Sequence, residues 1–392
     1  MQTTLTRNSR LVVLFVSVPI LTFALIGGYL RNTLAQEDVY RHLQIFEDVV
    51  TLISENYVEV VEYDELMQGA MRGLSDGLDG KSSYLTRQEV TLLEQDIPLP
   101  EGQTGLTLTN EYYPRIVAAR DGTPAEIAGL MPGDYVRNIN GESTRNISLL
   151  SATRLLRGEP GSKVSLTILR GNAMEPHTAE LTFTIAETSE ILTKMVSPGV
   201  GYLRIPTFEQ INPSEVASTI DTLMMTDTES LIIDLRETAE GALKTGHDFA
   251  ELFVPAGIMS IRESRGESRE VISIDKDGRY LTLRLVILIN SGTSGPAELF
   301  AAALATNQRA TLIGTQSQGQ AADQRLVKLP DGSGLWLSWT HYLTPDGEPI
   351  HGHGLEPSII AEEPFVEFGG NPPDDDQGLA KALDYLENGP AS

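Results

Sequence analysis

One stretch of the chain joins an unbroken apolar run to a tight loop and an alanine-rich segment, and it constrains the fold more than any other. Leu285–Ile289 is wholly apolar, as in a strand that is buried on both faces. Asn290–Gly295 is a polar loop, and Pro296 suits the first turn of a helix over 297–305. Such a strand–turn–helix presents N–H groups that suit an oxyanion or a nucleophile, but many chains use it only for packing.

Strand-like and helix-like patterns alternate on both sides of this stretch. Strands are expected at 201–205, 231–236, 285–289 and 310–314, with helices at 213–225, 242–253 and 297–305. Alternation of this kind is typical of a layered domain in which helices cover a sheet. A helical segment and a β-rich module precede this domain. The predicted fold class is therefore α/β multidomain.

The N-terminal region has the pattern of an export signal. Arg7 and Arg10 precede the apolar run Leu11–Leu30, which is about long enough to span a bilayer with the remainder exported. The alternatives are a signal peptide cleaved near Thr33–Ala35 and a buried core helix. In both export cases residues 37–392 work in the cell envelope outside the cytoplasm, anchored to the membrane or secreted.

Composition excludes several classes of function. The net charge of −25 argues against a nucleic-acid partner, since phosphate binding needs a basic surface. The absence of Cys excludes disulfides and thiolate chemistry. His351, His353 and the run Asp374–Asp376 are the weak candidates for metal binding, and a structural role and a solvated loop are the preferred interpretations. We predict neither a metal nor a cofactor.

The β-rich module over 105–171 resembles a PDZ domain. The resemblance rests on the phrases Thr123–Asp134 and Ile139–Gly141 and on the order of strands and short helices. PDZ domains add a peptide strand to their own sheet and hold its C-terminal carboxylate on backbone N–H groups. The resemblance places that loop at Gly105, Leu106, Thr107 and Leu108. The alternative is a PDZ fold that packs against its neighbour and binds nothing.

A second resemblance covers about residues 40–390. Tyr202–Phe208, Asp234–Arg236, Tyr342–Gly347 and Ile350–Pro357 are similar to motifs of the carboxyl-terminal processing serine peptidases, also called the S41 type. In the N-terminal part, 78–84 resembles the family's LDPHSxY, with Gly-Lys in place of Pro-His. The resemblance divides the chain into a signal or anchor (1–36), a helical domain (37–97), a PDZ domain (98–187), a peptidase-like α/β core (188–370) and an acidic linker with a C-terminal helix (371–392).

The family's nucleophile and base are missing from the matching positions, whereas the assisting Gln is retained as Gln324. The family uses a Ser nucleophile and a Lys general base that a Gln assists, and the resemblance places these roles at Gly295, Gln320 and Gln324. The oxyanion glycine of the family is Glu240 here, and a carboxylate there would oppose a developing negative charge. Glycine offers no nucleophile, and loss of a nucleophile alone lowers turnover roughly 10⁶-fold. These changes predict a pseudopeptidase.

A competing hypothesis keeps the enzyme active through Ser294, one residue before the family position. This serine would need a rearranged loop and a new base. The candidates for that base are Glu298, Lys244, His247 and Asp323.

The main hypothesis is a membrane-tethered, exported peptide-binding protein that acts as an adaptor or scaffold. Its expected ligands are C-terminal peptides or unfolded exported proteins, held by the PDZ domain. Its expected partners are another peptidase or further copies of itself. The runner-up is an active serine endopeptidase that cleaves exported proteins near their C-termini through Ser294. The third possibility is a purely structural oligomer that binds no peptide.

Overall fold

The computed structural model describes residues 40–95, 97–171, 175–185, 190–209, 211–370 and 375–389. The predicted apolar span Leu11–Leu30 and Asp374 lie outside these ranges. Among the helices that the structure describes, none is long and apolar enough to cross a membrane. The chain divides into two compact units, Met1–Ala70 and Met71–Ser392.

The N-terminal part is largely helical, in agreement with its periodic apolar residues. Residues 40–56 are helical, and α2 covers Tyr63–Asp76. Strand β1 (Ser83–Leu85) and helix α3 (Arg87–Glu94) follow. A capping box starts α3, because Thr86 accepts the Glu89 N–H while the Glu89 carboxylate accepts the Thr86 N–H.

The second part has the fold of a PDZ domain. Its main sheet has the order β3-β4-β5-β8-β9, with β6 paired to β5, and a small sheet has the order β10-β2-β7. The strands are β2 (Gly102–Gln103), β3 (Leu106–Thr109), β4 (Arg115–Ala119), β5 (Tyr135–Ile139), β6 (Glu142–Ser143), β7 (Arg157–Gly158), β8 (Lys163–Arg170), β9 (Glu175–Thr182) and β10 (Thr184–Ile185). The helices α4 (Pro124–Ile127) and α5 (Leu149–Leu155) complete it. Its own core includes Ile116, Val136 and Leu166.

The third part is a mostly parallel sheet with helices on both faces. The sheet order is β11-β12-β13-β16-β17-β20, and only β11 runs antiparallel to its neighbour. Its strands are β11 (Leu192–Ser197), β12 (Val200–Arg204), β13 (Ser230–Asp234), β16 (Arg284–Ile289), β17 (Ala310–Gly314) and β20 (Ile359–Ile360). This arrangement confirms the layered α/β prediction.

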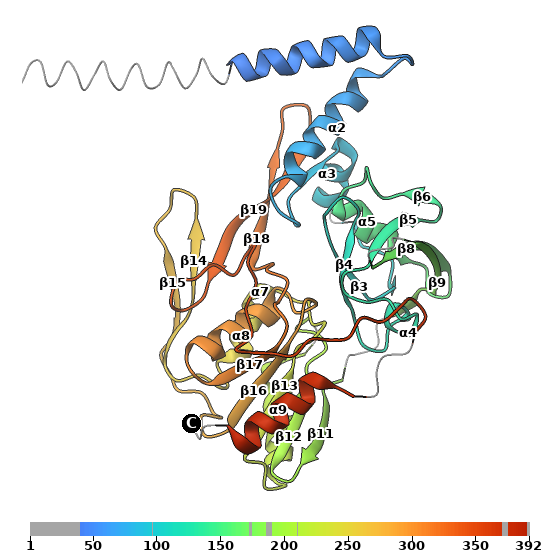
Figure 1. Ribbon diagram of the computed structural model, residues 1–392. Coiled ribbons are helices and arrows are strands. Elements are labelled where there is room, and N and C mark those ends of the chain that lie inside the picture. Colours follow the sequence, from blue (N-terminus) through green and yellow to red (C-terminus); the bar gives the residue numbers. More distant parts are fainter. Residues whose placement is uncertain are drawn as a thin grey trace, which may run out of the picture. The chain divides into compact units, whose positions relative to one another are not determined.

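Two apolar layers enclose this sheet. Helices α6 (Pro213–Met224), α7 (Leu243–Ala250) and α8 (Pro296–Thr306) share one cluster of buried side chains with the sheet, and α9 (Gln377–Asn388) covers the other face (Figure 1). Leu288 faces α9, whereas its neighbours Ile287 and Ile289 face the α6–α8 layer. The unbroken apolar run of β16 is explained by burial on both faces.

A separate antiparallel sheet has the order β1-β19-β14-β15, with β18 also paired to β19. Its later strands are β14 (Gly257–Ser264), β15 (Glu270–Ile274), β18 (Ala322–Lys328) and β19 (Gly334–Leu343). The predicted hairpin turn at 330–334 falls between β18 and β19. The β14–β15 hairpin was not predicted, because its strands carry mixed polar and apolar residues with few turn signals.

Candidate functional site: the loop between β16 and α8

The loop between β16 and α8 holds Gly295 in a backbone conformation that other residues rarely adopt. Gly295 has φ +60° and ψ −115° at the N-cap of α8. Nucleophile elbows hold their serine on a sharp, strained strand-to-helix turn of this kind. A Cβ at Gly295 would lie 3.7 Å from Leu243 Cδ2 and 3.9 Å from Ala239 O, which are ordinary contact distances. The position has room for a side chain and carries none.

Buried Glu298 ties this loop to the segment that follows β17. Its carboxylate accepts four hydrogen bonds, from the N–H groups of Gly295 (2.9 Å), Gly319 (2.6 Å) and Gln320 (2.8 Å) and from the Ser317 hydroxyl (2.5 Å). Burial raises the pKa of Glu298, and these hydrogen bonds act in the opposite direction. Glu298 therefore holds Gly295 and Gln320, the predicted nucleophile and base positions, together, and its oxygens are occupied.

The structure brings Ser294 and Gln320 together. The Ser294 hydroxyl donates to Gln320 Oε1 at 3.2 Å, and the two residues are 2% and 6% exposed. Gln320 Nε2 is buried and has no partner among the residues that the structure describes. An amide oxygen does not take up a proton near neutral pH, so Gln320 cannot activate this hydroxyl as a general base.

The region where an oxyanion would form lacks suitable donors. Pro296, directly after the nucleophile position, has no N–H, although nucleophile elbows use that N–H as an oxyanion donor. For Ser294 the corresponding donor is the Gly295 N–H, which Glu298 already accepts.

Glu240 has a cationic partner in the PDZ domain. Its carboxylate accepts from Arg120 Nη1 of the PDZ domain at 2.5 Å. Burial raises the pKa of Glu240, and the Arg120 charge opposes that rise. Glu240, the predicted oxyanion position, thus forms an ion pair between the core and the PDZ domain.

Three proposed bases for Ser294 have other partners. Lys244 pairs with Asp248, and Asp323 accepts from Tyr342 Oη at 3.0 Å. His247 Nε2 lies 2.8 Å from Ser260 Oγ, and burial lowers the pKa of His247 to about 4.

Lys81 is a buried amine that the sequence analysis did not consider as a base. Burial lowers the pKa of its ammonium group, while the charges of Glu298 and Asp79 oppose that shift. The backbone N–H of Lys81 donates to Asp79 Oδ1 at 2.8 Å, and this hydrogen bond stabilises the turn before β1. The signal was present in the sequence, since Lys81 stands where the family motif has His.

Gln324 and the predicted peptide-binding loop Gly105–Leu108 share no hydrogen bond with Ser294 among the residues that the structure describes. Gln324 Nε2 donates to Ala322 O at 2.9 Å, so this amide has a local partner. The predicted peptide-binding loop precedes and forms β3, which is an edge strand: it pairs with β4 and with no other strand that the structure describes. Leu106 is half-buried there and Leu108 is buried. An edge strand can accept an additional strand.

Comparisons with known proteins agree on one family. Residues 199–361 match the model of peptidase family S41, and residues 115–170 match a PDZ domain model. The chain is 30% identical over 316 residues to the carboxy-terminal processing protease CtpA of Bacillus subtilis, covering 80% of this chain and 67% of that protein. This chain belongs to the carboxyl-terminal processing protease family.

Other relatives of the family cover similar shares. The carboxyl-terminal-processing protease of Synechocystis sp. is 35% identical over 281 residues, and the match covers 70% of this chain and 65% of the relative. The carboxy-terminal-processing protease of Bartonella bacilliformis is 29% identical over 367 residues, covering 91% and 84%. The chain thus spans slightly less than two thirds of the Synechocystis protein and more of the other two.

The solved structures support the same fold. The photosystem II D1 C-terminal processing protease superposes with a TM-score of 0.68 over 87% of this chain and 96% of that one, at 22% identity. The predicted combination of a PDZ domain with an S41 α/β core is therefore confirmed. The predicted domain bounds and the assignment of individual catalytic positions remain predictions.

Proposed function

We propose that this family member is a peptide-binding pseudopeptidase, tethered to the membrane by its N-terminal segment and facing the cell envelope outside the cytoplasm. The observation that carries the proposal is Gly295, which keeps the backbone geometry of a nucleophile elbow and room for a side chain but has no hydroxyl. Pro296 and Gln320 support it, because one lacks an oxyanion N–H and the other cannot act as a base.

Peptide binding is assigned to the PDZ edge strand β3 and the loop Gly105–Leu108. The free edge of β3 offers main-chain hydrogen bonds to an added strand. The ligands are the C-termini of peptides or of unfolded exported proteins. By holding such segments without cutting them, the protein acts as an adaptor or scaffold for another peptidase or for copies of itself.

An active serine endopeptidase is the competing function, and two observations favour it. The Ser294 hydroxyl lies on the same turn as Gly295, and it contacts the side chain at the family's base position. Lys81 supplies an amine whose pKa burial lowers, as a general base requires. This alternative needs the loop to open, because Ser294 is 2% exposed.

Proteolysis separates these functions. The full chain, purified in a non-ionic detergent, is incubated with an unfolded reporter protein alongside Ser294→Ala and Lys81→Met. The pseudopeptidase predicts that the three proteins leave the reporter equally intact. Cleavage by the wild type that Ser294→Ala abolishes would overturn the proposal and establish the active enzyme. The double variant Gly295→Ser, Gln320→Lys tests whether the family positions are correctly assigned.

Peptide capture is measured by calorimetry on the full chain. A C-terminal hydrophobic peptide with a free carboxylate should bind more tightly than the same peptide as an amide. Leu106→Glu should weaken binding, because it adds a negative charge beside the carboxylate loop. Ile127→Glu is the matched control, since Ile127 is 77% exposed on α4 and adds the same charge outside the loop. Equal binding of the acid and the amide would count against carboxylate capture.

A further inference from the structure

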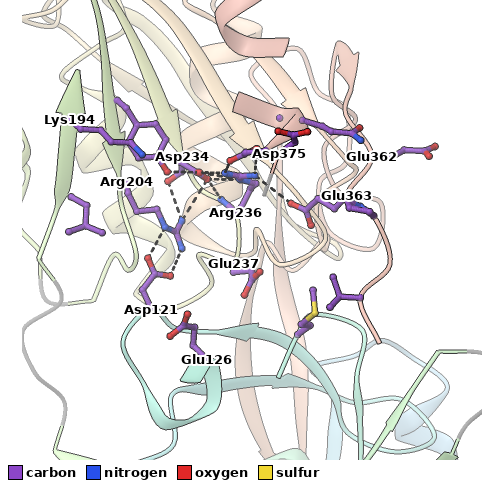
Figure 2. A pocket seen from close by; sticks show the side chains of 18 of the residues that line it. Asp121, Glu126, Lys194, Arg204, Asp234, Arg236, Glu237, Glu362, Glu363 and Asp375 are labelled. Carbon is purple, nitrogen blue, oxygen red and sulfur yellow. Dashed lines mark hydrogen bonds and ion pairs between the residues drawn. The ribbon is translucent and has the colours of Figure 1, made fainter. Parts of the chain in front are cut away.

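A cavity of about 680 Å³ lies between the carboxyl ends of β12 and β13 and the part of the PDZ domain that holds Asp121, Glu126 and Met131 (Figure 2). Its wall also includes β11, residues 362–366 and the start of α9. No lining residue belongs to β3 or to the Gly295 loop. The carboxyl ends of parallel strands are a common place for ligands in α/β sheets. This cavity is therefore separate from both sites in the proposed function.

The cavity wall has an excess of negative charge. Its carboxylates outnumber its cations by eight to three: Asp121, Glu126, Asp234, Glu237, Glu362, Glu363, Asp375 and Asp376 against Lys194, Arg204 and Arg236. The cations already have partners. Arg204 is held by Asp121 at 2.8 and 2.9 Å. Arg236 is held by Asp234 at 2.6 Å and by Asp376 at 2.8 Å, and Lys194 stacks 5.0 Å above the Tyr202 ring. Asp376 is exposed, as expected of a solvated loop, and it also pairs with Arg236 and caps α9.

Glu237 is the least exposed of the wall carboxylates that have no hydrogen-bond or ion-pair partner among the described residues, since Glu126, Glu362 and Asp375 are exposed. Its N–H donates to Asn290 Oδ1 at 3.0 Å, which fixes the residue at φ +55°. No described residue donates a hydrogen bond to its carboxyl oxygens or pairs with them, and Figure 2 shows the side chain in the cavity wall without an interaction line. A largely buried carboxylate without a partner is costly, so a cationic ligand would be stabilised there.

The wall favours an organic cation over a metal ion. No group of three or more His, Asp or Glu side chains that could hold a metal ion occurs in the part of the chain that the structure describes. The cavity is also many times larger than an ion. Met131, Leu192, Tyr202 and Val366 add apolar surface next to the carboxylates. Apolar walls with a few placed charges suit a ligand that has an aliphatic chain and a charged end.

We propose that this cavity binds a primary ammonium or guanidinium group carried on an aliphatic chain, with Glu237 as its counter-ion. The source of that chemistry is either a free polyamine or the Lys or Arg side chain of a polypeptide. The proposal stands independently of whether the protein cleaves peptides.

Calorimetry on the full chain in non-ionic detergent tests this site at pH 8 and physiological salt. The probes are spermidine and a Gly-Lys-Gly-Lys-Gly peptide blocked at both ends. At least one probe should bind, and Glu237→Gln should weaken it roughly tenfold or more, as expected for a charge-assisted hydrogen bond. Glu267→Gln is the control, because this exposed residue in the β14–β15 turn removes the same charge outside the cavity. Binding of spermidine alone indicates a free polyamine, and binding of the peptide alone indicates a polypeptide side chain.

Two outcomes would overturn the proposal: neither probe binds the wild type, or both variants weaken binding equally, which would indicate diffuse attraction to an acidic protein. Circular dichroism of each variant checks that it is folded.

The pH dependence of binding provides a second test. Burial raises the pKa of Glu237 to about 7, with Glu363 and Asp121 raising it further and Arg204 and Arg236 opposing. Binding should therefore weaken from pH 8 to pH 6 in the wild type and less so in Glu237→Gln.

Discussion

The ion pair between Arg120 and Glu240 joins the PDZ domain to the position where the family has an oxyanion glycine. Arg120 Nη1 lies 2.5 Å from Glu240 Oε2, and the side chains are 7% and 20% exposed. Replacing Arg120 by Met keeps most of the side-chain volume and removes the charge. The variant leaves the Glu240 carboxylate in a desolvated position without its cation.

Removal of one partner from a buried pair costs about 3–5 kcal/mol. Glu240 retains one fifth of its exposure, so water compensates in part, and we expect a loss near the lower end, about 3 kcal/mol. Arg120→Met combined with Glu240→Gln should be less destabilised than Arg120→Met alone, because no buried charge is left unpaired. The double-mutant cycle should give a coupling free energy of about 1.5–3 kcal/mol.

The loss should depend on pH. Burial already raises the pKa of Glu240, and Arg120 is the charge that opposes this rise. Without Arg120 the folded-state pKa moves further above the unfolded value, so folding favours the protonated carboxyl. Stability that rests on this proton is present at low pH and is lost as pH rises through the folded-state pKa. Arg120→Met should therefore be destabilised less at pH 5 than at pH 8.

Urea unfolding of the four proteins, followed by tryptophan fluorescence and circular dichroism at pH 5 and pH 8, measures these quantities. The exposed pair of Lys163 and Glu180 has the same 2.5 Å separation with side chains 61% and 60% exposed, and it serves as the control. Lys163→Met with Glu180→Gln should couple by less than about 1 kcal/mol. If Arg120 and Glu240 couple no more strongly than this control pair, the pair does not join the PDZ domain to the core.

Three further changes test the interior. Gly295→Ser should fold, since its Cβ meets no atom closer than 3.7 Å, and should lose about 1–2 kcal/mol in urea unfolding because φ is +60°. Glu298→Ala leaves four buried donors without an acceptor and should cost more than about 4 kcal/mol, or prevent folding as judged by circular dichroism. Arg170→Met breaks the buried pair with Asp134 (2.6 Å) and should cost about 3–5 kcal/mol, whereas replacing both residues by apolar ones should restore much of the loss, measured by the same unfolding assay.

Periodic apolar runs made most of the α/β core predictable. The β16 run and the Ala-rich α8 were placed to within one residue, because burial on both faces leaves no polar position to confuse the pattern. The β14–β15 hairpin escaped prediction because half-exposed strands carry Arg, Glu and Ser beside Ile and Met. Strand β14 pairs with β19, which lies about 80 residues later in the chain, so a local sequence pattern does not contain this partner.

The sequence predicts those features of the candidate site that depend on residue type alone, and it does not predict the contacts of its side chains. The missing hydroxyl of Gly295 and the missing amine of Gln320 follow from the residue types alone. The pairing of Glu240 with Arg120 joins positions 120 residues apart, and the burial of Lys81 near Glu298 likewise depends on the tertiary fold. No local pattern contains such contacts, so neither the Arg120 partner of Glu240 nor the burial of Lys81 follows from the sequence.

Gly295, Pro296 and Gln320 each stabilise the folded chain relative to a serine, a non-proline residue or a buried amine at the same position. Glycine at φ +60° removes the strain that a serine would hold there, about 1–2 kcal/mol. Gln320 avoids the desolvation of an amine at a position that is 6% exposed, and Pro296 reduces the freedom of the unfolded chain at a helix start. Glycine at 295 and glutamine at 320 thus cost less than a serine and a buried amine would cost there, and Glu298 accepts four hydrogen bonds in this region. A loop that kept its activity through Ser294 would have to open this stabilised arrangement, and Ser294→Ala is therefore expected to alter neither proteolysis nor the fold.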